Sequence, residues 1–147
     1  MSERRLFTIG FAGKSAERFF GLLRDAGVRR VIDVRRNNTS QMAGFTKRSD
    51  LGYFLHALLG VEYTHRPDLA PAAELLKGYR RKTVAWSQFE REYRESIAER
   101  DPGQLVPAGE LDHACLLCSE PTAERCHRRL LAEHLRDTLG GITICHL

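Results

Sequence analysis

Short apolar runs alternate with longer amphipathic stretches along the chain. The runs have the length of buried strands, and the amphipathic stretches repeat their apolar residues at helical spacing. The pattern predicts five strands, at Leu6–Ile9, Val31–Val34, Val61–Thr64, Ala114–Leu117 and Ile142–His146. It predicts helices over residues 16–26, 51–59, 72–79 and 86–100 and from about 122 to 139. Strands that alternate with helices favour a three-layer α/β sandwich with a mostly parallel central sheet. We therefore expect one Rossmann-like α/β domain over residues 1–147, without the glycine motif of dinucleotide-binding proteins.

Polar and small residues mark where these elements begin and end. Ser15 is a suitable N-cap for the first helix, and Ser49 or Asp50 for the second. Gly27 and Gly60 follow the same two helices and are expected to end them. The polar connection 37–41 shows no element of its own.

Polar side chains follow several of the predicted strands. Because the carboxyl ends of parallel strands form one edge of a sheet, residues 10–11, 33–36 and 118–120 should be neighbours there. His146, at the end of the last strand, is a candidate for the same edge. Ligands commonly bind at this edge in α/β proteins, so we expect a site there.

The segment from Ala114 to Arg129 carries the candidate chemistry. Cys118 ends a strand, and a thiol beside helix amides and arginines becomes a better nucleophile; the alternative is a small buried apolar residue. Glu120 either caps the last helix or accepts a proton. His127 is a candidate acid, base or metal ligand, or part of the core. Adjacent helical residues diverge by about 100°, so Cys126 and His127 are not expected to face one ligand together.

The charge of the chain favours anionic partners, such as nucleotides, nucleic acid or phosphorylated metabolites, and the alternative is a solvated basic surface. The formal net charge is +4, with a pI near 9.1. Arginines close to helix amides bind phosphate-like groups well, so Arg35 and Arg128, with Asp33 and His146, are candidate substrate-binding residues. An ion pair between Arg35 and Asp33 is the structural alternative, and it is compatible with binding if Asp33 holds Arg35 in place.

Composition narrows the class of protein. At 147 residues the chain suits a single domain with a full core, and it contains no apolar run of membrane-spanning length and no secretory signal. A cytoplasmic protein is expected, and its four cysteines need not form disulfides. Cys115 and Cys118 have CxxC spacing, but strand residues three apart point to opposite faces, which disfavours a zinc ribbon. No metal or cofactor is predicted.

Several segments, in their order along the chain, resemble the domain of unknown function 488 family. They are Thr8–Gly10, Val31–Arg35, Gly60–Tyr63, Cys118–Glu120, Cys126–Arg128 and Ile144–Leu147. The resemblance implies a bacterial-type single-domain α/β protein of no established activity. It places Asp33, Arg35, Cys118, Glu120, Cys126, His127, Arg128 and His146 at family motif positions. The chain departs from the family pattern at Phe11–Ala12, Asn37–Asn38 and Leu69–Pro71. A fainter likeness, to rhodanese-type sulfurtransferases and related phosphatases, rests on Ile32–Arg35 and a later strand-end cysteine.

Three functions remain open at this point. The leading hypothesis is an enzyme that binds an anionic, phosphate- or nucleotide-like substrate, with Cys118 as nucleophile and Glu120 or His127 moving protons. The second is an accessory domain that binds nucleic acid without catalysis, suggested by the arginine excess. The third is a metal-binding domain that uses Cys118, Cys126, His127 or His146. The sequence does not decide between an enzyme and a binding domain, nor does it indicate an oligomeric state.

Overall fold

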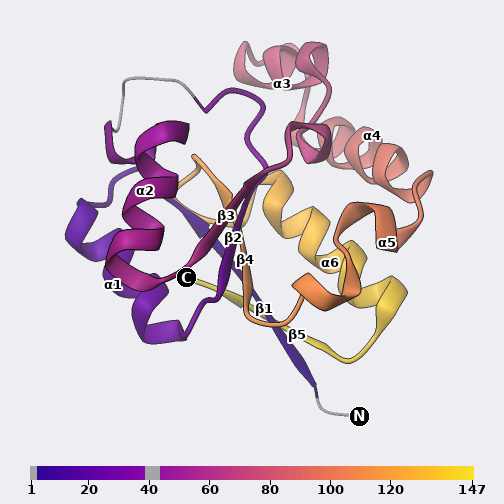
Figure 1. Cartoon of the computed structure of the whole chain (residues 1–147). Helices are drawn as coiled ribbons and strands as arrows, with labels where there is room; N and C mark the ends of the chain where they lie inside the picture. Colours follow the sequence, from indigo (N-terminus) through magenta and orange to yellow (C-terminus); the bar gives the residue numbers. More distant parts are fainter. Residues whose placement is uncertain (1–2, 39–43) are drawn as a thin grey trace.

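A five-stranded parallel sheet forms the centre of the computed structural model, which describes residues 3–38 and 44–147 (Figure 1). The strands are β1 (Arg4–Gly10), β2 (Arg30–Asp33), β3 (Glu62–His65), β4 (Ala114–Cys118) and β5 (Ile142–His146). Their order is β3-β2-β4-β1-β5, and every pairing is parallel. The five predicted strands and the parallel sheet are confirmed. β1 and β2 do not pair directly, because β4 lies between them.

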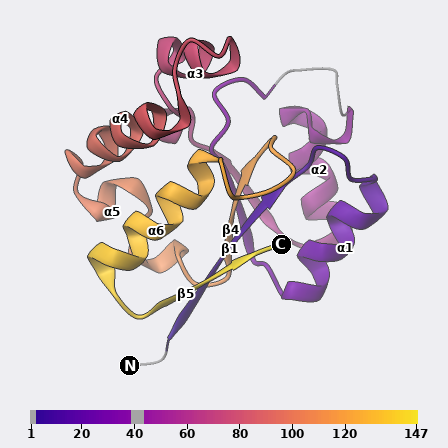
Figure 2. The ribbon, with the colours of Figure 1, turned by 180° about the vertical axis from the view of Figure 1, so that it is seen from behind.

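Helices cover both faces of this sheet, as the two opposite views show (Figures 1 and 2). α1 (Ala16–Ala26) and α2 (Arg48–Leu59) lie on one face. The other face carries α3 (Ala73–Arg80), α4 (Trp86–Ala98), α5 (Pro102–Leu105) and α6 (His127–Leu139). Short 3₁₀ turns occur at Gly44–Thr46, Pro67–Leu69 and Ala108–Glu110. The three-layer sandwich predicted from the sequence is therefore confirmed. None of the helices in the described residues combines the length and the apolar character that crossing a membrane requires.

The sheet separates two apolar cores. All five residues of β4 are buried, as expected for a central parallel strand that is covered on both faces. Successive side chains of a strand point to opposite faces, so Cys115 and Leu117 pack with α1 and α2 while Leu116 packs with α4 and α6. Phe89 and Tyr93 of α4 belong to this second core, as their helical spacing indicated.

Two helix starts differ from the sequence prediction. α2 begins at Arg48 with Lys47 as its N-cap, ahead of both Ser49 and Asp50. α6 begins at His127 rather than near residue 122, so Glu120 does not cap it. The N-cap of α6 is Cys126, whose backbone is extended and whose thiol is buried against Cys118. This contact across the loop keeps residues before 127 out of the helix, and no local sequence signal reveals it.

Two further segments complete the comparison with the sequence. The short helix α5 was not expected, and Asp101 accepts a hydrogen bond from the Gly103 backbone N–H at its start. Most of the polar connection 37–41 lies outside the described residues, which resume at Gly44.

Candidate active site around Cys118

The carboxyl ends of the strands bring sequence-distant polar residues together, as predicted. Cys118, at the end of β4, lies beside Gly10 at the end of β1. Leu117 lies beside Asp33 of β2, and Thr8 of β1 lies beside His146 of β5. This edge of the sheet therefore holds the cysteine, the acidic residue and the histidine that were singled out from the sequence.

Three hydrogen-bond donors surround the Cys118 sulfur, which is buried. The Cys126 sulfur lies 2.6 Å away and the Arg128 Nη1 atom 2.8 Å away, and the Glu120 backbone N–H also contributes. Burial alone would raise the pKa of the Cys118 thiol. The hydrogen bond from Cys126 and the positive charge of Arg128 outweigh burial and hold this pKa below its ordinary value. Cys118 is thus the group in this site that is most readily ionised to a thiolate.

Cys126 has the opposite character. Burial, together with the hydrogen bond to Cys118 and the negative charge of that thiolate, raises the pKa of the Cys126 thiol far above its ordinary value. Cys126 therefore keeps its proton and donates it to the Cys118 sulfur. The thiolate form is therefore favoured at Cys118, and Cys126 keeps its proton as the hydrogen-bond donor.

Arg128, in the first turn of α6, joins several elements around this pair. Its guanidinium is 1% exposed, and its Nη1 atom donates to the Glu120 carbonyl at 2.8 Å as well as to Cys118. Its Nε atom donates to the Thr8 hydroxyl at 3.2 Å. That hydroxyl lies 2.6 Å from His146 Nδ1, and its own proton is available for this second bond. A hydrogen-bonded chain therefore runs from Cys118 through Arg128 and Thr8 to His146, which is exposed.

The loop after Cys118 approaches β1 closely because Gly10 has no side chain. The Phe11 and Ala12 backbone N–H groups donate to the Cys118 and Ser119 carbonyls. A Cβ atom placed on Gly10 would lie 1.5 Å from the Glu120 carbonyl oxygen and 2.8 Å from Arg128 Nη1. Glycine is therefore required for this close packing of loop, strand and guanidinium.

A second cation lies at the same place and was not anticipated from the sequence. Lys14 donates from Nζ to the Gly10 carbonyl at 2.6 Å. Burial and the nearby charges of Arg128 and Arg18 lower the pKa of Lys14, while the charge of Cys118 opposes that shift. Its signal in the sequence was weak, because one lysine in the loop after a first strand resembles any solvent-exposed lysine.

Asp33 and Arg35 form a separate buried cluster at the end of β2. Arg35 donates to both carboxylate oxygens of Asp33, at 2.9 and 2.8 Å, and to the Thr46 carbonyl. Tyr63 donates its hydroxyl proton to Asp33 at 2.6 Å; burial first, and then the charge of Asp33, raise the pKa of Tyr63. The Arg35 guanidinium also lies over the Phe11 ring, 5.2 Å from its centroid. Phe11 thus connects this cluster with the loop that carries Cys118.

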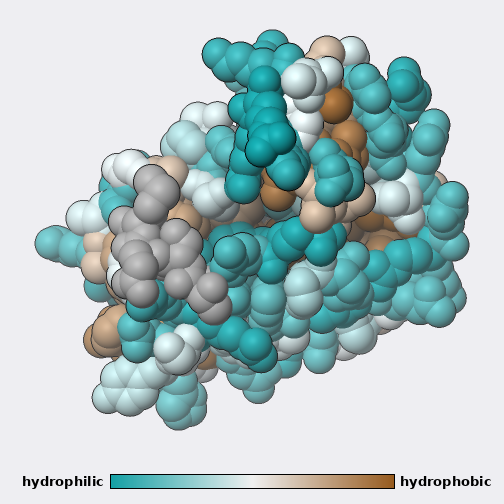
Figure 3. Space-filling model, turned by 90° about the horizontal axis from the view of Figure 1, so that it is seen from above, coloured by the Kyte–Doolittle hydropathy of each residue, from teal (hydrophilic) through white to brown (hydrophobic). Residues whose placement is uncertain are grey.

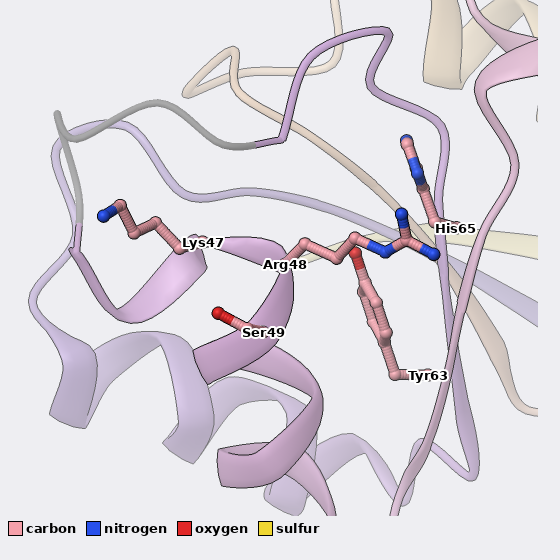
Figure 4. A pocket seen from close by; sticks show the side chains of 5 residues that line it. All are labelled: Lys47, Arg48, Ser49, Tyr63 and His65. Atoms are coloured by element: carbon pink, nitrogen blue, oxygen red, sulfur yellow. The ribbon is translucent and has the colours of Figure 1, made fainter.

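A cavity of about 520 Å³ opens beside this second cluster. Its lining residues come from the start of α2 and from β3: Lys47, Arg48, Ser49, Tyr63 and His65. Figure 4 shows Arg48, Tyr63 and His65 converging on one space while Lys47 extends away from them. Tyr63 and His65 of β3 form one wall of this cavity. β3 is two strands away from β4, a separation of about 10 Å at normal strand spacing.

His127 and Glu120 occupy different positions from Cys118 and Arg128. The buried His127 Nε2–H donates to the Val34 carbonyl at 2.8 Å, and its ring packs against Tyr93. Burial lowers the pKa of His127 to about 4, so its imidazole is neutral at pH 7. Cys126 and His127 have different neighbours, Cys118 and Val34, although Cys126 lies ahead of the helix and not within it. The Glu120 side chain is exposed, and its backbone takes part in the site.

Metal-ligating side chains do not gather in the part of the chain that the structure describes. Within residues 3–38 and 44–147, no three His, Cys, Asp or Glu side chains are arranged to hold a metal ion. The Cys118 and Cys126 sulfurs lie together, but His127 and His146 bond to Val34 and Thr8 instead. The four residues that the sequence suggested as metal ligands therefore form three separate contacts and no single cluster.

Comparison with known proteins places the chain in a family. The family model described as Domain of unknown function DUF488 matches residues 15–135, which is most of the sequence. The chain belongs to this family. No curated protein matches it. The match includes Asp33, Cys118 and Arg128, whereas Thr8, Gly10 and His146 of the same site lie outside the matched range.

Replacing Gly10 should disturb the site directly. We expect Gly10→Ala to cost about 1–3 kcal/mol of unfolding free energy, because the new methyl group overlaps the Glu120 carbonyl. Gly109→Ala is the matched control, since a Cβ there meets nothing within 4 Å. Urea unfolding of both variants measures the difference. Equal stabilities would contradict the close packing described here.

The neutral state of His127 should make stability depend on pH. The unfolded chain binds a proton at His127 near pH 6.5, whereas the folded chain binds it near pH 4. Unfolding is therefore favoured as pH falls through this window, by about 3 kcal/mol in full at about 1.4 kcal/mol per pKa unit. His127→Gln removes this titration and should flatten the loss of stability between pH 6.5 and 4.

Urea midpoints at several pH values measure that slope. Burial also lowers the pKa of His134 and of His146, so the variant keeps a smaller slope of the same sign. A variant with the slope of the parent protein would show that His127 is not the titrating group.

Proposed function

We propose that the protein is a cysteine-dependent enzyme acting on an anionic substrate, with Cys118 as its nucleophile. The observation that carries this proposal is the 2.8 Å contact between the Cys118 sulfur and the Arg128 guanidinium. A thiolate reacts with electrophiles, whereas a thiol does not react at a useful rate, so a cysteine held below its ordinary pKa is suited to nucleophilic attack.

The other cysteines support the assignment by contrast. Cys115 also lies in β4, but burial raises its pKa well above the ordinary value, although the charge of Arg128 opposes the shift. Cys145 is exposed and carries no comparable set of donors. Three donors converge on Cys118 instead. A cysteine that only fills the apolar core is not expected to be surrounded by donors in this way. A neutral thiol is a weak acceptor, so burying these donors around it would cost free energy.

The charge around Cys118 supports an anionic substrate. The charge of Arg128 disfavours that of Lys14, which donates to the Gly10 carbonyl at the same edge of the sheet. An anion that binds between loop and helix would relieve this repulsion. The cavity beside α2 adds Lys47 and Arg48 on the same edge of the sheet. In the view from above (Figure 3), this side of the molecule is mostly hydrophilic.

The remaining candidate residues take the following places in the proposal. Asp33 fixes Arg35 beside Phe11, and Arg35 is proposed to contact the substrate from that side. His146 is proposed to exchange protons with solvent through Thr8. Glu120, whose carboxylate is exposed beside the site, stays the candidate proton acceptor. A proton-transfer role for His127 stays a prediction that has less support, because its Nε2–H is committed to Val34.

The nucleic-acid hypothesis has less support than the enzyme hypothesis. Many exposed arginines are paired with carboxylates on the same surface, among them Arg24 with Asp25 and Arg136 with Asp137. Arg66 and Arg100 share Asp68, and Arg94 and Arg129 share Glu133. Local pairing reduces the field that a phosphate backbone would meet.

The pH dependence of alkylation tests the nucleophile. We expect the rate of Cys118 alkylation by iodoacetamide to level off above a midpoint that is lower than the value of about 8.5 of an unperturbed thiol. Peptide mapping after timed quenching gives the rate for each cysteine separately. The midpoint is independent of how accessible the sulfur is, which matters because Cys118 is 2% exposed.

Two comparisons make this measurement specific. The urea-unfolded chain gives the reference midpoint for Cys118, and Arg128→Met should move the Cys118 midpoint of the folded protein upward by removing the guanidinium. A Cys118 midpoint at or above that of the urea-unfolded chain would refute the nucleophile assignment.

The choice of alkylating agent tests the anionic substrate. Iodoacetate is anionic and iodoacetamide is neutral, so the ratio of their rates at one cysteine reports the local electrostatic potential. We expect this ratio at Cys118 to be several-fold higher in the folded protein than in the urea-unfolded chain, and to fall as salt is added.

Lys14→Gln should lower the ratio, since it removes a cation beside the sulfur. Lys77→Gln, an exposed position on α3, is the matched control and should leave it unchanged. A ratio that is the same folded and unfolded would exclude a site prepared for an anion, whatever the midpoint of Cys118.

A further inference from the structure

Cys126 lies close enough to Cys118 to do more than donate a hydrogen bond to its sulfur. Arg128 and the Glu120 N–H also stabilise a thiolate at Cys118, beside the hydrogen bond from Cys126. The Cys126 sulfur lies 2.6 Å from that of Cys118, with both residues buried. A Ser or Asp side chain is more usual at an N-cap, where it hydrogen-bonds to the first turn of the helix. Cys126 occupies the N-cap of α6 and makes no such hydrogen bond.

The two cysteines are also chemically unequal. Cys118 has a lowered pKa and Cys126 a raised one, so one sulfur carries the negative charge and the other carries the proton. They stand on different elements, the end of β4 and the start of α6, joined by the loop 119–125. A bond between the sulfurs, which is about 2.05 Å long, needs a movement of only about half an ångström.

We propose that Cys118 and Cys126 are a reversible redox pair, in which Cys118 reacts with hydrogen peroxide and Cys126 closes a disulfide with it. This proposal rests on the thiolate of Cys118 from the proposed function, and it adds a modification site and a second reactive residue. Hydrogen peroxide suits the site because it is small and uncharged, so it can reach a sulfur that is nearly buried.

The reaction balances in two steps. The Cys118 thiolate attacks one peroxide oxygen, the O–O bond breaks, and the products are a sulfenic acid at Cys118 and hydroxide, which takes up a proton to become water. The Cys126 sulfur then attacks the Cys118 sulfur, the S–O bond breaks, and the departing hydroxyl leaves with the Cys126 proton as a second water. Two thiols are oxidised and one peroxide is reduced to two waters.

Closure would remove the charge on which the site is built. The disulfide carries no thiolate, so Arg128 loses its anionic partner and keeps the Glu120 carbonyl and the Thr8 hydroxyl. Cys118 can no longer attack a substrate in this state. The oxidised protein is therefore a resting form, and a thiol reductant returns it to the active one.

Peptide mapping after peroxide treatment tests the pair in the full-length protein. The reduced protein is desalted, exposed to equimolar hydrogen peroxide, and its remaining thiols are blocked under denaturing conditions. We expect a peptide that links Cys118 to Cys126, a mass lower by two hydrogens, and loss of Cys118 alkylation that dithiothreitol restores. Oxidation of Cys118 to a sulfinic acid without a linked peptide would overturn the proposal, as would no oxidation at all.

Two variants separate the steps. Cys126→Ser should leave the sulfenic acid at Cys118 without a partner, so that dimedone traps it there. Cys145→Ser, at an exposed position, should form the same link as the parent protein. Links that run through Cys145 between molecules, in place of the Cys118–Cys126 link, would refute the pair.

The proposed function and the redox pair can fail independently. A low alkylation midpoint at Cys118 with no linked peptide leaves the nucleophile in place and excludes the redox pair. A linked peptide with an ordinary midpoint excludes the prepared nucleophile while the disulfide stands.

Discussion

The buried guanidinium of Arg128 is the interaction on which the rest of this site depends. It extends from the first turn of α6 and hydrogen-bonds to β1 through Thr8, to β4 through Cys118, and to the following loop through the Glu120 carbonyl. A buried cation is tolerated only when it is fully hydrogen-bonded, and the loss of one partner of such a pair typically costs about 3–5 kcal/mol. The same contacts that satisfy Arg128 therefore fix the distance between helix and sheet and favour the thiolate form of Cys118.

The Asp33–Arg35 cluster shows a different use of buried charge. Asp33 is fully buried and accepts hydrogen bonds from Arg35 and from Tyr63, so its charge is compensated within the fold. The cluster holds the segment after β2 against the start of α2 through the Thr46 carbonyl. It thereby shapes one side of the cavity that Tyr63 and His65 line. Buried charge lowers the pKa of a thiol in one cluster and positions the lining of a cavity in the other.

The sequence predicted the strands and the shared edge of the sheet well, and physical reasons explain which features it did not predict. Apolar periodicity located all five strands, and parallel pairing then placed Cys118, Asp33 and His146 at one edge. Periodicity cannot give the order of the strands, so the insertion of β4 between β1 and β2 was not foreseen.

Contacts across loops could not be predicted from the sequence either. The start of α6 depends on the Cys118–Cys126 contact, and the close approach at Gly10 depends on a carbonyl more than a hundred residues away. Lys14 was missed for the same reason, because its importance comes from Arg128 on another element. Cys115, Cys118 and Cys126 also look alike in the sequence. Only the fold shows that the Cys118 and Cys126 sulfurs are in contact, while Cys115 packs in the core beneath α1 and α2.

The position of β5 divides the site into parts of unequal local stability. β5 is an edge strand that pairs with β1 alone, whereas β4 is enclosed on both sides. Edge strands open more readily than central ones, and such opening needs far less free energy than global unfolding. When β5 opens, His146 leaves Thr8, but Cys118, Cys126 and Arg128 stay on the enclosed strand and on α6. The solvent end of the hydrogen-bonded chain is therefore detachable, and fraying of the C-terminal strand uncovers Thr8 while the contact between Arg128 and Cys118 stays in place.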